Sequence, residues 1–275
     1  MPLIWTSSQS QRIRELGGDI SQIEEFQTEE AREKAFSVLI EKLQSQHRKL
    51  IRDLSVNPRR HPLAELEDSL ANMLVSKGFL EVKTPTIISY EALRKMGIDK
   101  EHLLYEQVFW LDEKRCLRPM LAPNLYFLMR QLKRNVKMPL MMFEIGTCYR
   151  KESHGNSHLE EFTMLNLVEM KPSTDAMERL KEHIVSVMDQ VGLEYELVTA
   201  KSEVYVSTID VEVGGVEVAS GAVGPHVLDK AHGITDPWAG VGFGLERLLL
   251  MKSGDLNIKK VGRSLIYLNG ARIDI

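Results

Sequence analysis

The 275-residue chain has the composition of an ordinary globular protein, with 43% hydrophobic residues, 27% charged residues and a formal net charge of −4. This length suffices for one large domain, with or without a small appendage, and the slightly negative charge excludes a general attraction to nucleic acid, so that such a partner would need local basic patches. The two cysteines, Cys116 and Cys148, exclude a disulfide framework and a zinc cluster. Without a membrane-length apolar run or a signal-peptide pattern, the sequence predicts a cytoplasmic protein that does not bind a membrane.

The N-terminal region, 7–56, is predicted to be helical. Thr28 is a suitable N-cap, and the two glutamates that follow it complement the helix dipole. Pro58 marks the end of the helix, because the residue before a proline disfavours helical backbone. We therefore expect a helical extension at 1–58, packed on a main domain at 59–275.

The next hundred or so residues alternate helices with short strands and turns. We expect, in chain order, a helix at His61–Gly78, a strand at Phe79–Lys83, a helix capped by Ser89 and ending at Gly97, a hairpin made by Gln107–Asp112 and Arg115–Pro119, and a helix at Leu121–Arg134. One face of the last helix contains Ala122, Leu125, Tyr126 and Met129. From spacing alone, such a stripe is more typical of core packing than of a ligand pocket.

Residues 139–170 contain the most informative pattern, two strands joined by a polar loop. Successive side chains of a strand point to opposite faces, so one face of the second strand contains Phe162, Met164, Asn166, Val168 and Met170. That face is apolar except for one amide, and the loop end of the first strand adds cationic side chains. The combination suits a ligand with an anionic part and a mostly apolar part, although an amphipathic hairpin with a solvated loop would have the same periodicity.

The C-terminal part continues with one helix and several strands. We expect a helix capped by Ser173 or Thr174 and ending at Gly192, strands at Tyr195–Thr199, Val204–Val213 and Val216–Val223, and a glycine-spaced strand that runs into a helix at Asp236–Arg247. Hairpins with helices between them, without a repeated strand–helix–strand unit, indicate an α+β fold with an antiparallel sheet. The two common glycine loops for phosphate, GxxxxGK[ST] and GxGxxG, are absent.

Three stretches together resemble the class II aminoacyl-tRNA synthetases. They are the helix and strand that end at Pro85, the hairpin with Arg150 and Phe162, and the glycine-spaced stretch that ends at Arg247. More closely, LRPMLAPNLY at 117–126, FEIGTCYRKESHGNSHLEEFTMLNL at 143–167 and GFGLERLL at 242–249 resemble the pyrrolysyl-tRNA synthetases, in the short form that lacks a separate N-terminal tRNA-binding domain. The resemblance implies an antiparallel sheet of six to seven strands flanked by helices, and a homodimer built on the first stretch.

The same resemblance implies a nucleotide site for ATP and Mg²⁺. Arg150 is expected at the α-phosphate and the amino-acid carboxylate, and Arg247 at the γ-phosphate and the adenine, because a guanidinium binds oxyanions well. The other implied ATP-binding residues are Glu152, His158, Leu159, Phe162, Glu217 and Ser220, of which Glu217 and Ser220 are the implied Mg²⁺ ligands. The competing interpretations are surface ion pairs for the arginines, a solvated loop residue for His158 and a small strand residue for Ser220.

The resemblance also implies an amino-acid pocket, in which the apolar stripe of the helix at Leu121–Arg134 lines a ligand site instead of packing in the core. It consists of Ala122, Leu125, Tyr126, Met129, Met164, Asn166, Val168, Tyr205, Gly221 and Trp238. The group contains no Asp or Glu, so a lysine ammonium would be buried without a counter-ion, at a cost of several kcal/mol. A lysine acylated on its ε-nitrogen is neutral, and pyrrolysine fits this description: Asn166 can donate to its carbonyl and Tyr205 can reach its ring nitrogen. Met129, Val168 and Gly221 depart from the family's common residues, which leaves the pocket shape open.

The predicted function is ATP-dependent charging of a suppressor tRNA, with a CUA anticodon, with pyrrolysine through an aminoacyl-adenylate. Activity on other ε-acylated lysines is expected as well, because an apolar pocket discriminates weakly between similar bulky groups. The tRNA is expected to contact the N-terminal helices and the basic patches. The alternatives are a class II synthetase for phenylalanine or phosphoserine, and a synthetase-like paralogue that does not charge tRNA.

Overall fold

The computed structural model describes residues 3–20, 25–151, 158–202 and 205–275. The helices are α1 (Ser7–Glu15), α2 (Glu29–Val56), α3 (Pro62–Ser76), α4 (Tyr90–Lys95), α5 (Leu103–Glu106), α6 (Ala122–Leu132), α7 (Ala176–Val191), α8 (Asp229–His232), α9 (Leu245–Ser253) and a 3₁₀ turn, η1 (Ile258–Lys260). The strands are β1 (Leu80–Glu81), β2 (Ile87–Ser89), β3 (Arg115–Leu117), β4 (Leu140–Tyr149), β5 (Glu161–Met170), β6 (Glu196–Ser202), β7 (Val206–Val213), β8 (Val216–Gly224), β9 (Trp238–Gly244), β10 (Tyr267–Leu268) and β11 (Ala271–Arg272). None of the helices in these described ranges combines the length and the apolar composition of a membrane-spanning segment.

A sheet of seven strands, in the order β1-β4-β5-β9-β8-β7-β6, is the centre of the fold. The predicted α+β class and strand number are confirmed. The expectation of a wholly antiparallel sheet is wrong at one edge, where β1 pairs with β4 in parallel. Between β1 and β4 the chain forms β2, α4, α5, β3 and α6 rather than a tight hairpin. Such a long connection permits the parallel direction.

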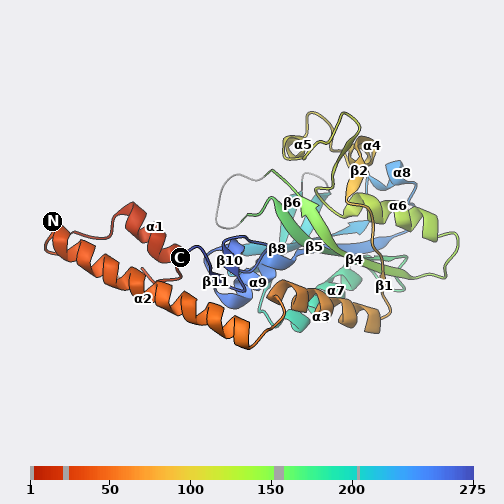
Figure 1. Cartoon of the computed structure of the whole chain (residues 1–275). Coiled ribbons are helices and arrows are strands. Elements are labelled where there is room, and N and C mark those ends of the chain that lie inside the picture. Colours follow the sequence, from red (N-terminus) through yellow and green to blue (C-terminus); the bar gives the residue numbers. More distant parts are fainter. Residues whose placement is uncertain (1–2, 21–24, 152–157, 203–204) are drawn as a thin grey trace.

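Helices cover the two faces of this sheet differently (Figure 1). On one face, α3, α7 and α9 pack on a continuous apolar core that includes Phe143, Leu165 and Phe243. On the other face, a second apolar cluster lies between the sheet and the segment that holds α4, α6 and α8. This second face also holds the cavity described below, so the second cluster both stabilises the fold and supplies most of the apolar side chains of a site.

One local prediction is confirmed in part and another needs correction. Arg115–Leu117 forms its regular ladder with β2, and it also meets its predicted partner, because Trp110 bridges to Cys116 and the backbone N–H of Leu117 donates to the Phe109 carbonyl. The helix α7 is capped by Asp175, which accepts from the backbone N–H groups of Met177 and Glu178. Three consecutive residues of capping type precede this helix, so the sequence could not decide between them.

The caps of α2 and α4 agree with the predictions. Thr28 accepts from the backbone N–H of Ala31, and Ser89 accepts from that of Ala92. Between α1 and α2 the helical pattern is interrupted after Glu15, because Leu16 and Gly17 turn the chain and Gly17 has a positive φ of 74°. The helical region is therefore two helices rather than one continuous segment.

The N-terminal helices form an arm that extends from the main body and meets the C-terminal end of the chain (Figure 1). His47 of α2 is buried, with Nε2 3.1 Å from the carbonyl oxygen of Leu16 and Nδ1 accepting from the backbone N–H of Arg272. Arg272 also pairs with Glu15 at 2.8 Å. His47 thus joins the arm to the C-terminus, and it does not belong to a surface basic patch.

Candidate active site

A cavity of about 290 Å³ lies on the second face of the sheet, between β5, β8, β9 and α6. Every predicted site residue that the structure describes lines it. They are Ala122, Leu125, Tyr126, Met129, Arg150, His158, Leu159, Phe162, Met164, Asn166, Val168, Tyr205, Glu217, Ser220, Gly221, Trp238 and Arg247. Glu152 lies outside the described residues. The structure therefore brings the predicted residues together, whereas their roles toward a ligand remain predictions.

The floor of the cavity is formed by β5 and β9. In β5, Phe162, Met164, Asn166 and Val168 share the cavity face, as the alternation predicted. The register places Met164, Asn166 and Val168 opposite Gly244, Gly242 and Gly240 of β9. A Cβ at Gly242 would lie 2.8 Å from Asn166 Oδ1. The alternating glycines therefore leave the room above β9 in which the β5 side chains and a ligand can lie.

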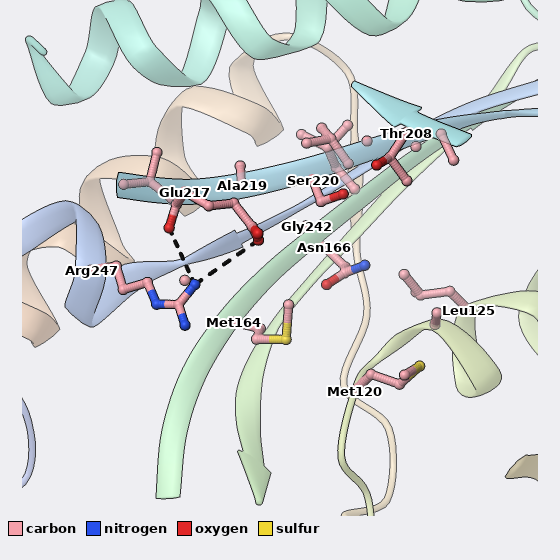
Figure 2. A pocket seen from close by; sticks show the side chains of 18 of the residues that line it. Met120, Leu125, Met164, Asn166, Thr208, Glu217, Ala219, Ser220, Gly242 and Arg247 are labelled. Atoms are coloured by element: carbon pink, nitrogen blue, oxygen red, sulfur yellow. Dashed lines mark hydrogen bonds and ion pairs between the residues drawn. The ribbon is translucent and has the colours of Figure 1, made fainter. Parts of the chain in front are cut away.

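A bulge in β8 brings Glu217 and Ser220 to one face. Val211 pairs with Ala219, but the next residue of β7, Glu212, pairs with Glu217, so Val218 is the extra residue. In a regular strand, residues three apart point to opposite faces, and the bulge removes this difference. Glu217 and Ser220 consequently both line the cavity, as the close view shows (Figure 2).

One end of the cavity is cationic. Arg247 of α9 reaches toward Glu217, with Nη1 3.2 Å from the Glu217 carbonyl oxygen and 4.0 Å from its carboxylate (Figure 2). Arg150, which follows β4, donates from Nε to the carbonyl of Pro119 at 2.9 Å, and its guanidinium lies 5.4 Å from the ring centroid of Phe162. Two guanidinium groups beside an aromatic face form an arrangement that can hold a polyanion and a flat base.

The carboxyl of Glu217 belongs to the same end. Burial, and the nearby carboxylate of Asp210, raise the pKa of Glu217 above its ordinary value, whereas Arg247 opposes the shift. Asp210 of β7 accepts from the Ser220 hydroxyl at 2.6 Å and from the Thr208 hydroxyl at 2.8 Å. The sequence analysis did not single out Asp210, because a regular hairpin at Gly214-Gly215 would place it opposite Ala219, and only the bulge puts it opposite Ser220.

A second missed residue, Glu246, connects the strand β5 to α9. Both of its carboxylate oxygens accept from the backbone N–H of Thr163 at 2.9 Å, and Arg263 lies 3.4 Å from one of them. Glu246 is buried, and burial raises the pKa of its carboxyl. This contact fixes Arg247, the next residue in the chain, relative to the aromatic ring of Phe162 on β5.

The opposite end of the cavity is apolar and enclosed. Leu125, Tyr126 and Met129 of α6 are buried, as are Val168 and Trp238. Met120 also lines this end, near Leu125, and was not predicted (Figure 2). Burial raises the pKa of the Tyr126 and Tyr205 hydroxyls, so both keep their protons at neutral pH.

Asn166 lies between the two ends (Figure 2). Its Oδ1 atom is buried and has no hydrogen-bond partner among the described residues. Leaving a buried acceptor without a partner costs about 1–3 kcal/mol, so such an atom at a cavity surface indicates a ligand that supplies a donor.

Gly221 lines the cavity only through its backbone. A Cβ built at this position would point away from the cavity and lie 2.7 Å from Leu180 of α7. The glycine therefore determines how closely β8 packs on α7. A side chain at this position would not narrow the cavity directly.

The cavity contains groups that fit a magnesium-bound nucleotide. Among the described residues, there is no cluster of three or more His, Cys, Asp or Glu that could hold a metal by itself. Glu217 and Ser220 supply two hard oxygen atoms on one face, and Mg²⁺ typically takes a few protein oxygens and completes its shell with phosphate and water. The donor set thus fits Mg²⁺ that arrives with a triphosphate.

Residues 49–268 match the family model described as "tRNA synthetases class II core domain (F)". A crystal structure of pyrrolysyl-tRNA synthetase from Desulfitobacterium hafniense is 48% identical, covers 100% of both chains and has a TM-score of 0.92. A second structure of the synthetase from this organism is 47% identical, with a TM-score of 0.90, and covers 100% of this chain and 96% of the other.

More distant similarity extends to threonine–tRNA ligases. The ligase of Wolbachia sp. subsp. Drosophila simulans is 35% identical over 99 residues, and that of Wolbachia pipientis subsp. Culex pipiens is 34% identical over 99 residues. Each match covers 34% of this chain and only 15% of the ligase's length. These ligases therefore share one segment of the fold with this chain.

Proposed function

The chain belongs to the class II aminoacyl-tRNA synthetases, in the family of the pyrrolysyl-tRNA synthetases, and from this premise we propose that it uses ATP to attach pyrrolysine to a tRNA. One observation carries the proposal: a single cavity has a cationic end and an enclosed apolar end, with the unpaired amide oxygen of Asn166 between them. The reaction joins a polyanion to a long, neutral amino acid, and it needs both ends in one site.

At the cationic end, Arg150 and Arg247 would bind the phosphates of ATP, and Phe162 would stack on the adenine. Class II synthetases use ATP and Mg²⁺, and we propose that Glu217 and Ser220 hold the ion, which when bound supplies positive charge to the phosphates. His158 and Leu159 line the same end, and we propose that they contact the nucleotide. The attack of a carboxylate on a phosphate needs positioning and charge stabilisation rather than a strong base.

At the apolar end, we propose that Asn166 recognises the amide of an acylated lysine. A secondary amide offers one N–H donor and one carbonyl acceptor, and the asparagine side chain offers the complementary pair. Because a secondary amide is trans, these two groups point in opposite directions, so Asn166 would contact one of them: Oδ1 would accept from the ε-N–H, or Nδ2 would donate to the carbonyl. Tyr205 would contact the ring nitrogen, and the apolar walls would enclose the aliphatic chain.

Other amino acids fit these walls less well. Threonine would fill little of the apolar end, and phosphoserine would place its charges against buried Leu125 and Trp238. Phenylalanine would leave Asn166 Oδ1 without a donor. A paralogue that does not charge tRNA would have no need for Arg150, Phe162 and Arg247, which this chain retains together in one cavity.

The tRNA and a second copy of the chain are proposed as partners, and the chain is proposed to act in the cytoplasm. Along α2 lie several exposed cationic side chains, namely Lys34, Lys42, Arg48, Lys49 and Arg52. They support contact between residues 1–58 and the phosphates of a tRNA. Exposed apolar side chains between β1 and α6, including Leu80, Ile87 and Phe127, support a homodimer interface in the region where the family resemblance predicts it.

Acylation of a tRNA with a CUA anticodon tests the proposal. The purified protein is incubated with ATP, Mg²⁺ and pyrrolysine, and the charged tRNA is separated from the uncharged form on an acid gel. We expect charging with pyrrolysine, charging at a lower rate with other ε-acylated lysines, and none with threonine, phenylalanine or phosphoserine. Charging with one of the latter three, and none with pyrrolysine, would overturn the proposal.

A further inference from the structure

A buried carboxylate, Asp229, lies behind the apolar end of the cavity. It is 2% exposed and does not line the cavity. Its Oδ1 accepts from the Tyr126 hydroxyl at 2.9 Å, and its Oδ2 accepts from Trp238 Nε1 at 2.9 Å and from the backbone N–H of His226 at 2.6 Å. One side chain thus holds two of the aromatic walls of the cavity.

The aromatic rings around Asp229 are packed on one another as well. Tyr126 and Trp238 meet edge to face, with centroids 5.8 Å apart, and His232 stacks on the other side of Tyr126 at 4.2 Å. Asp229 and His232 are the first and last residues of α8, so this short helix places an acceptor at the Tyr126 hydroxyl and a ring against the Tyr126 face. The ring centroid of Tyr205 lies 6.1 Å from that of Trp238, so Tyr205, which also lines the cavity, belongs to the same group of aromatic rings.

We propose that Asp229 is a positioning residue for amino-acid specificity, which fixes the Tyr126 and Trp238 rings and thereby the depth and shape of the pocket. This inference rests on the proposed function. Packing between rings is less directional than a hydrogen bond, and hydrogen bonds to a carboxylate are short and strong, so Asp229 adds a constraint on both rings that packing does not supply. An apolar pocket selects by shape, so the group that fixes its rings also fixes the substrates that fit.

Asp229 does not act as a counter-ion for a cationic substrate. Its two oxygens already accept three hydrogen bonds, and its side chain does not line the cavity. The argument that lysine is excluded from the apolar end therefore still holds, although the sequence analysis did not include this carboxylate.

The variant D229N tests the inference with a change of one atom. The carboxylate charge is lost in every orientation of the new amide. Its N–H₂ group must face either Trp238 Nε1–H and the His226 N–H, which can only donate, or the Tyr126 hydroxyl, which must then turn and accept, so the contact to at least one ring is weakened. In ATP–pyrophosphate exchange, we expect the KM for pyrrolysine to rise about tenfold or more, the usual effect of losing a hydrogen bond to a charged group. The KM for ATP should stay within about twofold of the wild-type value, because the cationic end does not contact Asp229.

The matched control is E169Q. Glu169 is also a buried carboxylate, which accepts from Arg179 at 2.7 Å and contacts His183 at 2.8 Å, but it does not line the cavity. If E169Q lowers the melting temperature without changing the KM for pyrrolysine, a merely structural loss cannot explain the D229N result. A wild-type KM for pyrrolysine in D229N, or equal rises in both KM values, would overturn the inference.

A measurement without substrate separates this inference from the proposed function. The chain has three tryptophans, and in a ¹⁵N–¹H spectrum D229N should shift the indole resonance of Trp238 and leave those of Trp5 and Trp110 in place. An unmoved Trp238 resonance would overturn the positioning role of Asp229, whatever the enzyme's substrate is. Conversely, if the wild-type protein shows no ATP–pyrophosphate exchange with pyrrolysine, the proposed function is overturned. The spectrum would still test whether Asp229 positions Trp238.

The variant Y126F provides a second test should D229N fail to fold. It removes the Tyr126 hydroxyl, which donates to Asp229 and also hydrogen-bonds to Tyr205, and we expect the KM for pyrrolysine to rise while the KM for ATP does not. If D229N is folded, the double variant Y126F/D229N should lose less in kcat/KM than the product of the two single losses, because both changes break one contact. A wild-type KM in Y126F, or fully multiplicative losses, would contradict the positioning role.

Discussion

The two ends of the cavity differ in how their side chains are held. At the cationic end, the side chains of Arg247 and Glu217 are 36% and 51% exposed and lie 4.0 Å apart, a type of pair that stabilises a protein little. At the apolar end, Tyr126 and Trp238 are only 3% and 4% exposed, and both donate to one buried carboxylate, Asp229.

The difference indicates where each kind of specificity comes from. ATP carries its own charges, so partly exposed guanidinium groups can bind it through charge and hydrogen bonds. A long, neutral side chain offers few hydrogen-bonding groups, so the site must recognise it by the fixed shape of the pocket and by one amide. The amino-acid end is therefore built into the folded core, and changes there should affect substrate choice rather than nucleotide binding.

The largest expected effect is at the cationic end, where R150A should lower the exchange rate about a hundredfold or more, as loss of a main oxyanion-binding group does. R150K keeps the charge but loses the two-pronged guanidinium, so its rate should lie between the two. The measurement is kcat for ATP–pyrophosphate exchange at saturating pyrrolysine. A loss of less than about tenfold in R150A would contradict the assignment of Arg150 to this end.

The next effect is at the junction of the two ends. N166A should lower kcat/KM for pyrrolysine about ten- to a hundredfold and leave the KM for ATP unchanged. The melting temperature should not fall, because the Oδ1 atom that is removed has no partner in the described residues. The control is N124A: Asn124 donates to Thr84 Oγ1 and to the Pro85 carbonyl, so this variant should lose stability but not selectivity. The reverse pattern would contradict the comparison.

A smaller effect is expected from G242A. The added Cβ would lie 2.8 Å from Asn166 Oδ1 and 3.1 Å from Nδ2, so the amide must leave its preferred rotamer. This should raise the KM for pyrrolysine about two- to tenfold, which corresponds to the cost of an off-rotamer side chain. In the N166A background the same change should have no effect on KM. An equal effect in both backgrounds would show that Gly242 does not act through Asn166.

The smallest effect concerns pH. Burial lowers the pKa of His232, and nearby Lys95 and Arg130 lower it as well, whereas Asp229 raises it. The unfolded chain therefore takes up the proton first, and the contribution of His232 to stability is lost as the pH falls below about 6.5. Between pH 8 and about 6.5, His232 stays neutral, and the KM for pyrrolysine should not change with pH on its account. Comparing wild type with H232F by thermal unfolding at several pH values checks this: equal pH dependence in the two proteins would contradict it.

The sequence predicted the site better than it predicted the connections around it. The cavity face of β5 followed from strand alternation, and the glycines of β9 were visible as a spacing pattern. The resemblance to class II synthetases then connected Arg150 with Arg247, nearly a hundred positions apart in the chain. Each of these is either a local property of a strand or a pattern carried by a family.

Contacts that depend on tertiary structure could not be predicted from the sequence. Asp229 lies in a helix of four residues, which is too short to show periodicity, and its contact with Tyr126 spans 103 positions. The bulge at Val218 depends on the pairing of β8 with β7, which no single strand reveals. Likewise, the ladder between β2 and β3 joins two segments that the sequence analysis did not connect, because the pairing of two such short strands is decided by packing.

The central claim is that the apolar end admits a neutral acylated lysine and rejects lysine itself. The most direct measurement is the ratio of kcat/KM for pyrrolysine to that for lysine in ATP–pyrophosphate exchange, with the same enzyme and saturating ATP. An ammonium buried without a counter-ion costs several kcal/mol, so we predict a ratio of at least about a thousand. A ratio within about tenfold of one, or exchange with lysine alone, would contradict the account.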